Sequence, residues 1–345
     1  MRDIRIYDFE FNLLCIMTDI ISSEWHLLYN GVGTYEGHFR LSDKITDIIM
    51  ANRYIVIVQG DLQAICTGRI IDNELTVCGR TVNWILSKRV RPPFKTSEIF
   101  GNYTDPETIL LYCLKKGFTE PPLIDANGVE ASSIDNNRVV SNFVIPKPLG
   151  ADKLDTHFWR VSANDIETLC VDLCNKMDRG HRVIFDVINK CWKFEFICPQ
   201  KNERLISKES KTAYNFELKD DLQNEANGGW YAKYDSEADG ESSWHYIKSE
   251  DKSGIYNWDC VLSCSSESEA NDELLKKSGQ FNIQSQIRNL KFGTDYKLGD
   301  IVPVYYKYGH ISDTQYYIIN GVDIKMTIGD SYEEPILKRY YSQNT

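Results

Sequence analysis

With 345 residues, the chain is longer than one hydrophobic core normally serves, so two or three compact units are expected. Its composition, with 42% hydrophobic and 26% charged residues, is that of an ordinary soluble protein and excludes disorder over most of the length. The net charge of −11 argues against specific nucleic-acid binding, which needs a basic surface.

No apolar run approaches the roughly 18–20 residues that a membrane-spanning helix requires, and residues 1–5 do not begin a secretory signal. We therefore expect no membrane span and folding in a cytoplasm. The ten cysteines are sparse for a disulfide scaffold, and many occupy apolar positions, which favours reduced and buried thiols.

The first hundred residues predict a β-rich unit. Turn-forming residues separate short β-branched runs, a spacing that favours antiparallel pairing in a barrel or sandwich. Short helices are expected at residues 43–50 and 81–88, and Pro92-Pro93 ends the unit. The expected strands are residues 4–8, 13–21, 37–41, 54–58, 64–71 and 75–78.

Two longer helices are predicted in the middle of the chain. The first covers residues 104–116, where residues 104–107 form a capping box with proline in the first turn and Gly117 marks the end. The second begins at residues 162–165 and ends at Gly180. One buried face of this second helix is expected to contain Ile166, Leu169, Cys170, Leu173, Cys174 and Met177.

Strands are expected around these helices as well. Residues 138–145 read as a strand, and residues 146–150 as a linker or turn. A hairpin is predicted from residues 183–188 and 191–198, with its turn at Asn189-Lys190 and with Trp192, Phe194 and Phe196 facing the core. Residues 213–218 predict one more strand.

An acidic segment lies between residues 220 and 275. It holds fourteen acidic residues and three lysines, a balance equal to the whole net charge of the chain. Its many aromatic residues argue against full disorder and favour two strands joined by a long loop, or a partly mobile insertion. A short helix at residues 268–277 and a strand at residues 284–290 are expected to follow.

Near the C-terminus, residues 292–304 read as a tight turn that leads into a β-branched strand. Gly293 and Gly299 permit a positive φ, and Asp295 and Asp300 can accept hydrogen bonds from nearby backbone amides. Strands at residues 316–319 and 322–328 and a polar tail are expected after it.

The sequence lacks the patterns of a catalytic or metal site. Its six histidines are scattered and read as surface or satisfied structural residues, and neither a nucleophile elbow nor a phosphate-binding loop is present. Metal binding at Cys170 and Cys174 is disfavoured because both belong to an apolar stripe, and the pair Cys260 and Cys264 lacks knuckle spacing. We assign no catalytic, cofactor-binding or metal-binding residue and expect no cofactor.

One enzymatic alternative stays open. Asp235, Glu237, Asp239 and Glu241 stand among tryptophans and tyrosines, a mixture that sugar-cleaving clefts also use. The separation of the carboxylates, which would define such a mechanism, is unreadable from sequence.

Three stretches, taken together, carry a resemblance to a known family. They are the N-terminal strands with Trp25 and residues 35–41, the strand, Gly79-Arg80 turn and helix of residues 75–89, and the run Tyr296-Lys297-Leu298-Gly299-Asp300-Ile301-Val302. In this order they resemble the hub proteins at the tip of phage tails and related contractile particles, including the siphophage tail hub and the N-terminal module of tail-associated lysins. The family-motif structural residues would be Gly79, Arg80, Tyr296, Leu298, Gly299 and Asp300. Residues 215–259 align little with the family.

The resemblance implies an α+β, β-dominated fold with two barrel-like tube-forming domains and with α-rich and α+β peripheral domains. The expected boundaries are a first barrel at 1–95, a helix and loop domain with a return strand at 96–160, an α+β domain with the acidic insertion 220–275 at 161–280, and a second barrel at 281–345.

The resemblance also implies a non-enzymatic homotrimer in the tail tip or baseplate of the virion, assembled in the host cytoplasm and serving genome delivery. Its expected partners are itself, distal tail and tube proteins, the tape-measure protein, and tip fibre or spike proteins. The alternative is a carbohydrate-directed cell-wall hydrolase or glycan-binding module of the same particle.

Overall fold

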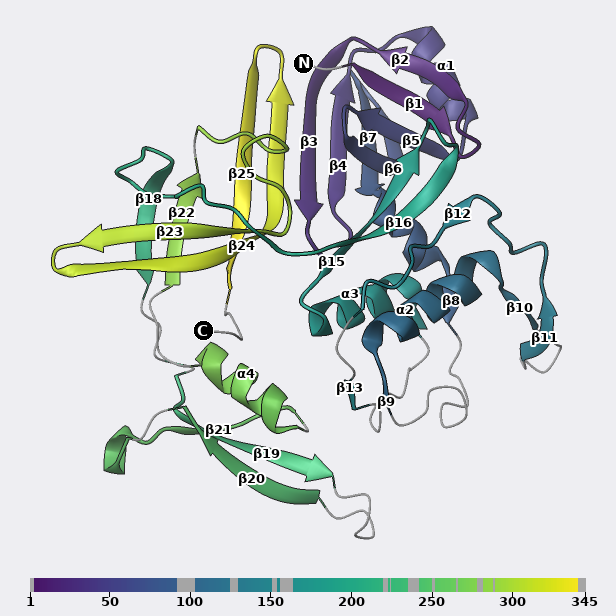
Figure 1. The fold of residues 1–345 in the computed structure, drawn as a ribbon. Coiled ribbons are helices and arrows are strands. Elements are labelled where there is room, and N and C mark those ends of the chain that lie inside the picture. Colours follow the sequence, from purple (N-terminus) through teal and green to yellow (C-terminus); the bar gives the residue numbers. More distant parts are fainter. Residues whose placement is uncertain are drawn as a thin grey trace. The chain divides into compact units, whose positions relative to one another are not determined.

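The computed structural model describes residues 3–91, 103–124, 130–150, 154–155, 164–219, 223, 225–234, 242–249, 252–264, 266–277, 282–287 and 289–340. More of these residues lie in strands than in helices, and the strands form several sheets. The predicted β-dominated α+β class is therefore confirmed (Figure 1). The chain divides into two compact units. The first comprises Met1–Asn202, Leu290–Ile301 and Ile318–Ile336, and the second Glu203–Asn289, Val302–Tyr317 and Leu337–Thr345.

One large sheet of eleven strands contains most of the strands of the first unit, and parts of its strands β23, β24 and β25 belong to the second unit. Its order is β17-β23-β24-β3-β4-β7-β6-β5-β1-β2, with β25 also pairing β24. The strands are β1 (Ile4–Asp8), β2 (Leu13–Met17), β3 (Ile20–Leu28), β4 (Thr34–Phe39), β5 (Ile55–Gln59), β6 (Leu62–Ile71), β7 (Leu75–Thr81), β17 (Gln200–Lys201), β23 (Asp300–Tyr308), β24 (Ile311–Thr327) and β25 (Asp330–Arg339). Among the described strands, the terminal members β17 and β2 do not pair with each other, so the sheet is not closed into a barrel.

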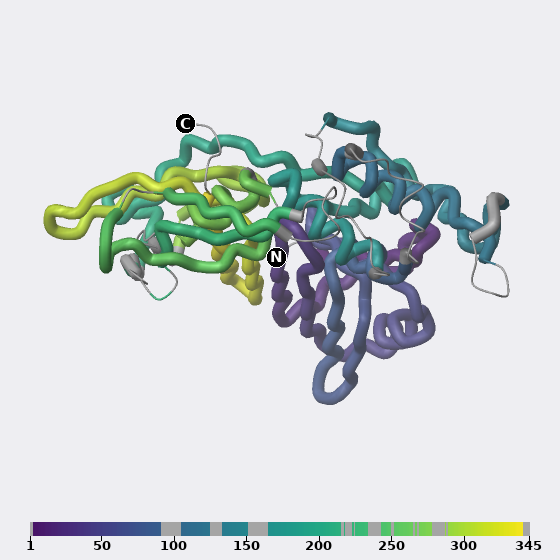
Figure 2. Tube along the Cα trace, turned by 90° about the horizontal axis from the view of Figure 1, so that it is seen from below, coloured from purple at the N-terminus to yellow at the C-terminus, as the bar shows by residue number. Residues whose placement is uncertain are grey.

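The pairing of β3 with β24 joins the two ends of the sequence. Trp25 lies opposite Ile324, and His26 lies opposite Asp323. Strands β23 and β24 run side by side as a long hairpin, which both Figure 1 and Figure 2 show.

The C-terminal strands differ from the sequence prediction. The two strands expected at residues 316–319 and 322–328 are one strand, β24, which runs through Gly321. A Cβ atom at Gly321 would lie 2.8 Å from the Leu27 carbonyl oxygen, so this glycine serves a close approach of strands rather than a turn. The expected polar tail contains β25, where Pro335 is tolerated because, among the described strands, β25 pairs only with β24.

The helices confirm the predicted positions and correct their ends. They are α1 (Asp43–Ala51), the 3-10 helix η1 (Val82–Lys88), α2 (Pro106–Leu114) with a π-helical turn at Lys115–Thr119, and α3 (Ile166–Lys176). Asp105, not Thr104, caps α2 by accepting a hydrogen bond from the Thr108 amide. The Glu107 side chain therefore does not cap the helix, and it is buried. Gly117 lies inside the π-helical turn rather than at a helix end.

The region after α3 folds as a hairpin, as expected. Strands β15 (Gly180–Asp186) and β16 (Cys191–Ile197) pair along their whole length, and β12 (Phe143–Val144) adds to β16 in parallel. Gly180 begins β15, and it is Asp178 that takes the positive φ beyond the helix. The strand expected at residues 138–145 shrinks to β12 because Val140 donates its amide to the Phe118 carbonyl instead of a strand.

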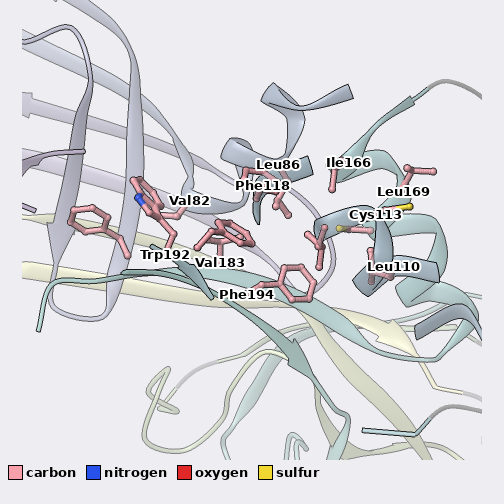
Figure 3. Packing of buried hydrophobic residues seen from close by; sticks show 14 of the residues in the cluster. Val82, Leu86, Leu110, Cys113, Phe118, Ile166, Leu169, Val183, Trp192 and Phe194 are labelled. Carbon is pink, nitrogen blue, oxygen red and sulfur yellow. The ribbon is translucent and has the colours of Figure 1, made fainter. Parts of the chain in front are cut away.

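One hydrophobic core joins η1, α2 and α3 to the hairpin and to strands β1, β5 and β6 of the large sheet (Figure 3). Trp192 and Phe194 of β16 are buried in it, as the alternation of the hairpin predicts, whereas Phe196 is partly buried. The predicted face of α3 is buried as well, with Met177 partly covered at its end.

Shorter pairs complete this unit. They are β8 (Val90–Arg91) with β14 (Asn164–Asp165), β9 (Tyr103–Thr104) with β13 (Leu154–Asp155), and β10 (Pro122–Ile124) with β11 (Glu130–Ile134).

The second unit contains the acidic segment, which includes two antiparallel strands as predicted. They are β19 (Gly228–Tyr234) and β20 (Ser242–Lys248), and β21 (Asp259–Val261) pairs with β19 in parallel. Helix α4 (Glu267–Lys277) packs on this sheet, and a short 3-10 helix lies at Gly254–Tyr256. Strands β18 (Ala213–Lys219) and β22 (Asn282–Ile287) form a separate antiparallel pair.

Candidate functional site

The first family-motif pair, Gly79-Arg80, lies within strand β7 and not in the predicted turn, and its two residues face opposite sides of the large sheet. Gly79 is buried, and a Cβ atom there would lie 2.9 Å from the Ile65 carbonyl oxygen, so close strand packing requires glycine. Arg80 is exposed, pairs in register with Thr34 of β4, and makes no ion pair with any residue that the structure describes.

The outer face around Arg80 is hollowed and carries both signs of charge. The hollow has a volume of about 690 Å³. His26 and Asp323 face each other across β3 and β24 at 2.5 Å, and Lys325 pairs with Glu24 on the same two strands. Other polar residues that line the hollow are Glu36, Arg80, Tyr332 and Glu334. Exposed pairs of this kind add little stability.

His38 extends this polar face on β4. Its ring nitrogens lie 2.6 Å from a Glu74 oxygen and 3.0 Å from a Glu36 oxygen. Partial burial acts to lower the pKa of His38, but the hydrogen bonds with Glu74 and Glu36 together outweigh it and raise the pKa. The two carboxylates therefore stabilise the imidazolium form relative to the neutral ring.

The inner face of the same strands is aromatic and buried. The rings of Trp25 and Tyr35 lie 4.3 Å apart between centroids. Gln59 of β5 accepts hydrogen bonds from the Trp25 indole at 2.8 Å and from the Ser23 hydroxyl at 3.0 Å. A buried amide thus holds the tryptophan that the family resemblance singles out.

The second family motif is the turn before β23, and its local chemistry is as predicted. Gly293 and Gly299 have φ of +81° and +86°. Asp295 accepts a hydrogen bond from the Lys291 amide at 2.9 Å, and Asp300 accepts one from the Lys297 amide at 3.0 Å. The prediction of a glycine- and aspartate-shaped turn is confirmed.

This turn is anchored to distant parts of the first unit. Asp300 also accepts a hydrogen bond from the Asn202 side chain at 2.8 Å, and the Gly299 amide donates to the Ile319 carbonyl of β24. Tyr296 is buried, which raises the pKa of its hydroxyl, and Leu298 is half-buried. The motif residues therefore sit at a junction of β17, β23 and β24.

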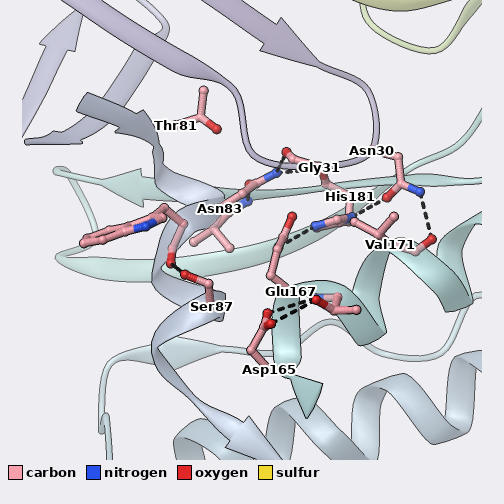
Figure 4. A network of polar contacts seen from close by, with 12 residues as sticks. Asn30, Gly31, Thr81, Asn83, Ser87, Asp165, Glu167, Val171 and His181 are labelled. Atoms are coloured by element: carbon pink, nitrogen blue, oxygen red, sulfur yellow. Dashed lines mark hydrogen bonds and ion pairs between the residues drawn. The ribbon is translucent and has the colours of Figure 1, made fainter. Parts of the chain in front are cut away.

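Side-chain amides hold a strand edge in a way that the sequence did not reveal. Strand β15 lies at the edge of its sheet, and Asn83 of η1 accepts from the Val183 amide at 2.7 Å while donating to the His181 carbonyl at 3.3 Å (Figure 4). Gln63 of β6 accepts from the Phe185 amide at 2.8 Å and donates to the Phe185 carbonyl at 2.9 Å. The two amides replace a neighbouring strand.

A buried polar chain lies beside this edge. His181 is fully buried and contacts Glu167 of α3 at 3.0 Å and Asn30 at 2.7 Å (Figure 4). Glu107 of α2 is also buried, and it accepts the Leu149 amide at 2.6 Å and pairs with Arg179 at 3.3 Å. Each of these residues has a partner within the chain and so connects separate elements, although one oxygen of Glu107 and one of Glu167 are buried without a hydrogen bond to any described residue.

The remaining candidates for chemistry stay structural or lie outside the described residues. All ten cysteines are free, and burial raises the pKa of Cys264 to about 11, which suppresses its thiolate. The five described histidines are paired, buried or exposed on the surface, as predicted, and His157 lies outside the described ranges. The carboxylates of the enzymatic alternative, at positions 235, 237, 239 and 241, also lie outside them.

The residues that the structure describes also limit the class of site. Within them, no three or more histidine, cysteine or acidic residues group so as to hold a metal ion. None of the helices in the described ranges has the length and apolar character needed to cross a membrane.

Comparison with known proteins decides the family. A family model described as Siphovirus ReqiPepy6 Gp37-like protein matches residues 3–230. The chain belongs to this siphovirus tail protein family. No curated protein sequence matches this chain.

Solved structures share the fold of the siphovirus tail protein over nearly its whole length. Prophage tail protein gp18 from Listeria monocytogenes matches with a TM-score of 0.61 and 14% identity, covering 99% of this chain and 95% of that one. The 43 kDa tail protein of prophage MuSo2 from Shewanella oneidensis matches with a TM-score of 0.56 and 8% identity, covering 98% of each chain. A tail protein from Neisseria meningitidis matches with a TM-score of 0.54 and 10% identity, covering 98% of this chain and 96% of that one. The predicted relationship to phage tail proteins is confirmed.

Proposed function

We propose that this siphovirus tail protein is a non-enzymatic structural hub at the distal end of the tail. Three copies would form a ring that joins the tail tube and distal tail ring to the tail tip. The observation that supports this most is the fold correspondence with a prophage tail protein over 99% of this chain and 95% of the other. It supports one architecture over the full length rather than a tail module joined to an unrelated enzyme.

The ring would be built from the two sheet regions that the motifs mark. In this proposal residues 1–95 and 281–345 supply two barrel-like surfaces per chain, and residues 96–160 and 161–280 lie at the periphery. Copies related by threefold rotation would close the barrels between them, since an open sheet leaves edge strands whose backbone groups a neighbouring copy can pair with. Gly79, Tyr296, Leu298, Gly299 and Asp300 would maintain these surfaces, and Arg80 would contact the next copy.

Assembly with neighbouring tail proteins tests this role. Gel filtration with light scattering of the chain, alone and with the tube and distal tail proteins of the same particle, should give a species of three 39.8 kDa copies. Electron microscopy of tails should place this ring at the distal end, where the tape-measure and tip fibre or spike proteins also converge.

A charge-reversed pair of variants makes the test specific. Arg80→Glu should abolish ring formation, because it places a carboxylate in a hollow that already contains Glu24, Glu36 and Glu334. Lys147→Glu, an exposed charge reversal in the region that the proposal places at the periphery, should assemble normally. A chain that stays monomeric with every neighbouring tail protein, or that hydrolyses peptidoglycan, would contradict the proposal.

A further inference from the structure

The three-stranded sheet of the acidic segment has one covered face and one open face. Helix α4 covers the side that carries Tyr231 and Leu262, which pack against Ala270 and Leu274. Because residues opposite each other in register share a face, Trp230 lies beside Tyr246 on β20 and Val261 on β21, and Trp244 lies beside Ala232. Trp230 is 41% exposed, Trp244 57% and Val261 66%. We call the face formed by Trp230, Trp244, Tyr246, Asp259 and Val261 the aromatic platform.

The aromatic platform is held in place by specific contacts. The Tyr246 side chain crosses the central strand over Gly228, and its hydroxyl donates to Asp259 at 2.7 Å. A Cβ atom at Gly228 would lie 2.1 Å from the Tyr246 oxygen, so only glycine lets the tyrosine lie across β19. The Trp230 and Tyr246 rings lie 4.8 Å apart between centroids. This hydrogen bond also raises the pKa of Tyr246, so the phenol remains a donor.

Polar groups stand at the edge of the rings. Asp259 is exposed and accepts from Tyr246 through one carboxylate oxygen, while the Asn257 side chain lies 3.4 Å from that same oxygen. The second oxygen of Asp259 has no partner among the described residues. Fixed rings with a few placed polar groups are the composition of a binding site for a ligand that is apolar on one side and polar at its rim.

We propose that the aromatic platform binds a neutral polysaccharide. A pyranose ring presents a face of C–H bonds, which stacks on the electron-rich face of an indole, and a rim of hydroxyls, which donate to a carboxylate such as Asp259. Trp230 and Trp244 provide the stacking surfaces on neighbouring strands. The acidic segment carries the whole net charge of the chain, so anionic polymers are repelled and a neutral glycan is favoured.

The test uses the full chain and an array of neutral oligosaccharides of glucose, galactose, rhamnose and N-acetylglucosamine. Oligosaccharides that bind are then titrated by calorimetry against Trp244→Ala and Trp230→Ala. We expect each substitution to weaken binding by about tenfold, the loss of one stacking contact. The matched control is Tyr308→Ala, which removes an exposed aromatic residue of β23 outside the platform. This variant should bind the oligosaccharide with unchanged affinity.

Three results would overturn the proposal. The first is that no glycan of the array binds, and the second is that neither tryptophan substitution weakens binding. The third is that the Trp244→Ala chain loses a contact with another tail protein while no glycan binds, which would make the platform a protein interface. Ring formation, measured on the same variants by light scattering, should stay intact. Failure of glycan binding is therefore distinguishable from failure of the hub role.

Discussion

At Gly299 the backbone and the packing independently require glycine. Its φ of +86° lies in the left-handed region, and a Cβ atom there would lie 2.6 Å from the Tyr29 ring and 3.1 Å from Ile197. Gly293, in the same turn, has a nearly equal φ of +81° but no atom within 4 Å of its Cβ position. An alanine at Gly293 would therefore meet backbone strain alone, whereas an alanine at Gly299 would meet both backbone strain and crowding.

This pair gives a prediction for stability. Gly293→Ala should lower the free energy of unfolding by about 1–2 kcal/mol, the strain of a left-handed alanine. Gly299→Ala should lose about 1–3 kcal/mol more, because Tyr29 and Ile197 must also move. Urea unfolding of the two variants measures the difference. Equal losses would show that the close packing of Gly299 against Tyr29 contributes nothing.

Strand β15 forms backbone hydrogen bonds to strand β16 on one side and to side chains, instead of a strand, on the other. Gln63 and Asn83 come from different elements, β6 and η1, so the amides also attach the hairpin to the large sheet. A polar residue at an otherwise apolar strand or helix position is the sequence signal for such a role.

Removing either side-chain amide should lower the free energy of unfolding. Gln63→Leu leaves both the amide and the carbonyl of Phe185 without their partner, and Asn83→Leu does the same to Val183 and His181. We expect each variant to lose roughly 2–4 kcal/mol of unfolding free energy in urea titrations.

The control for these variants is Asn189→Leu, in the exposed turn of the same hairpin. There the lost hydrogen bond to Asp186 is replaced by water, so the loss should stay below about 1 kcal/mol. If all three variants lose the same free energy, the amides do not secure the edge of β15.

For the whole molecule, the pairing of β3 with β24 completes the large sheet. A chain that ends at residue 309 lacks β24 and β25, so β3 loses one of its two neighbours and the Trp25 face loses cover. We expect this chain to lose its cooperative thermal transition in circular dichroism. Adding a peptide of residues 310–340 should restore the transition, and a scrambled peptide should not. A truncated chain that melts like the full one would contradict this view.

The sequence predicted the parts whose cause is local. The turn at Gly293 and Gly299, the α3 stripe and the β15–β16 hairpin follow from residues close to one another in the chain. The sequence did not predict that β3 pairs with β24, since periodicity says which face of a strand is buried but not which strand lies beside it. It also missed the inward turn of Glu107, because a glutamate at a helix start reads equally well as a solvated cap.

The β3–β24 pairing also fixes an order of events during synthesis. His26 and Asp323 are 297 positions apart, so at roughly 5–20 residues per second the ribosome needs about 15–60 s to deliver the partner of β3. Over that time the growing chain holds an unfinished edge, which is where premature association begins. Only a chain translated through β24 has the finished sheet, so β3 stays without this neighbour until then.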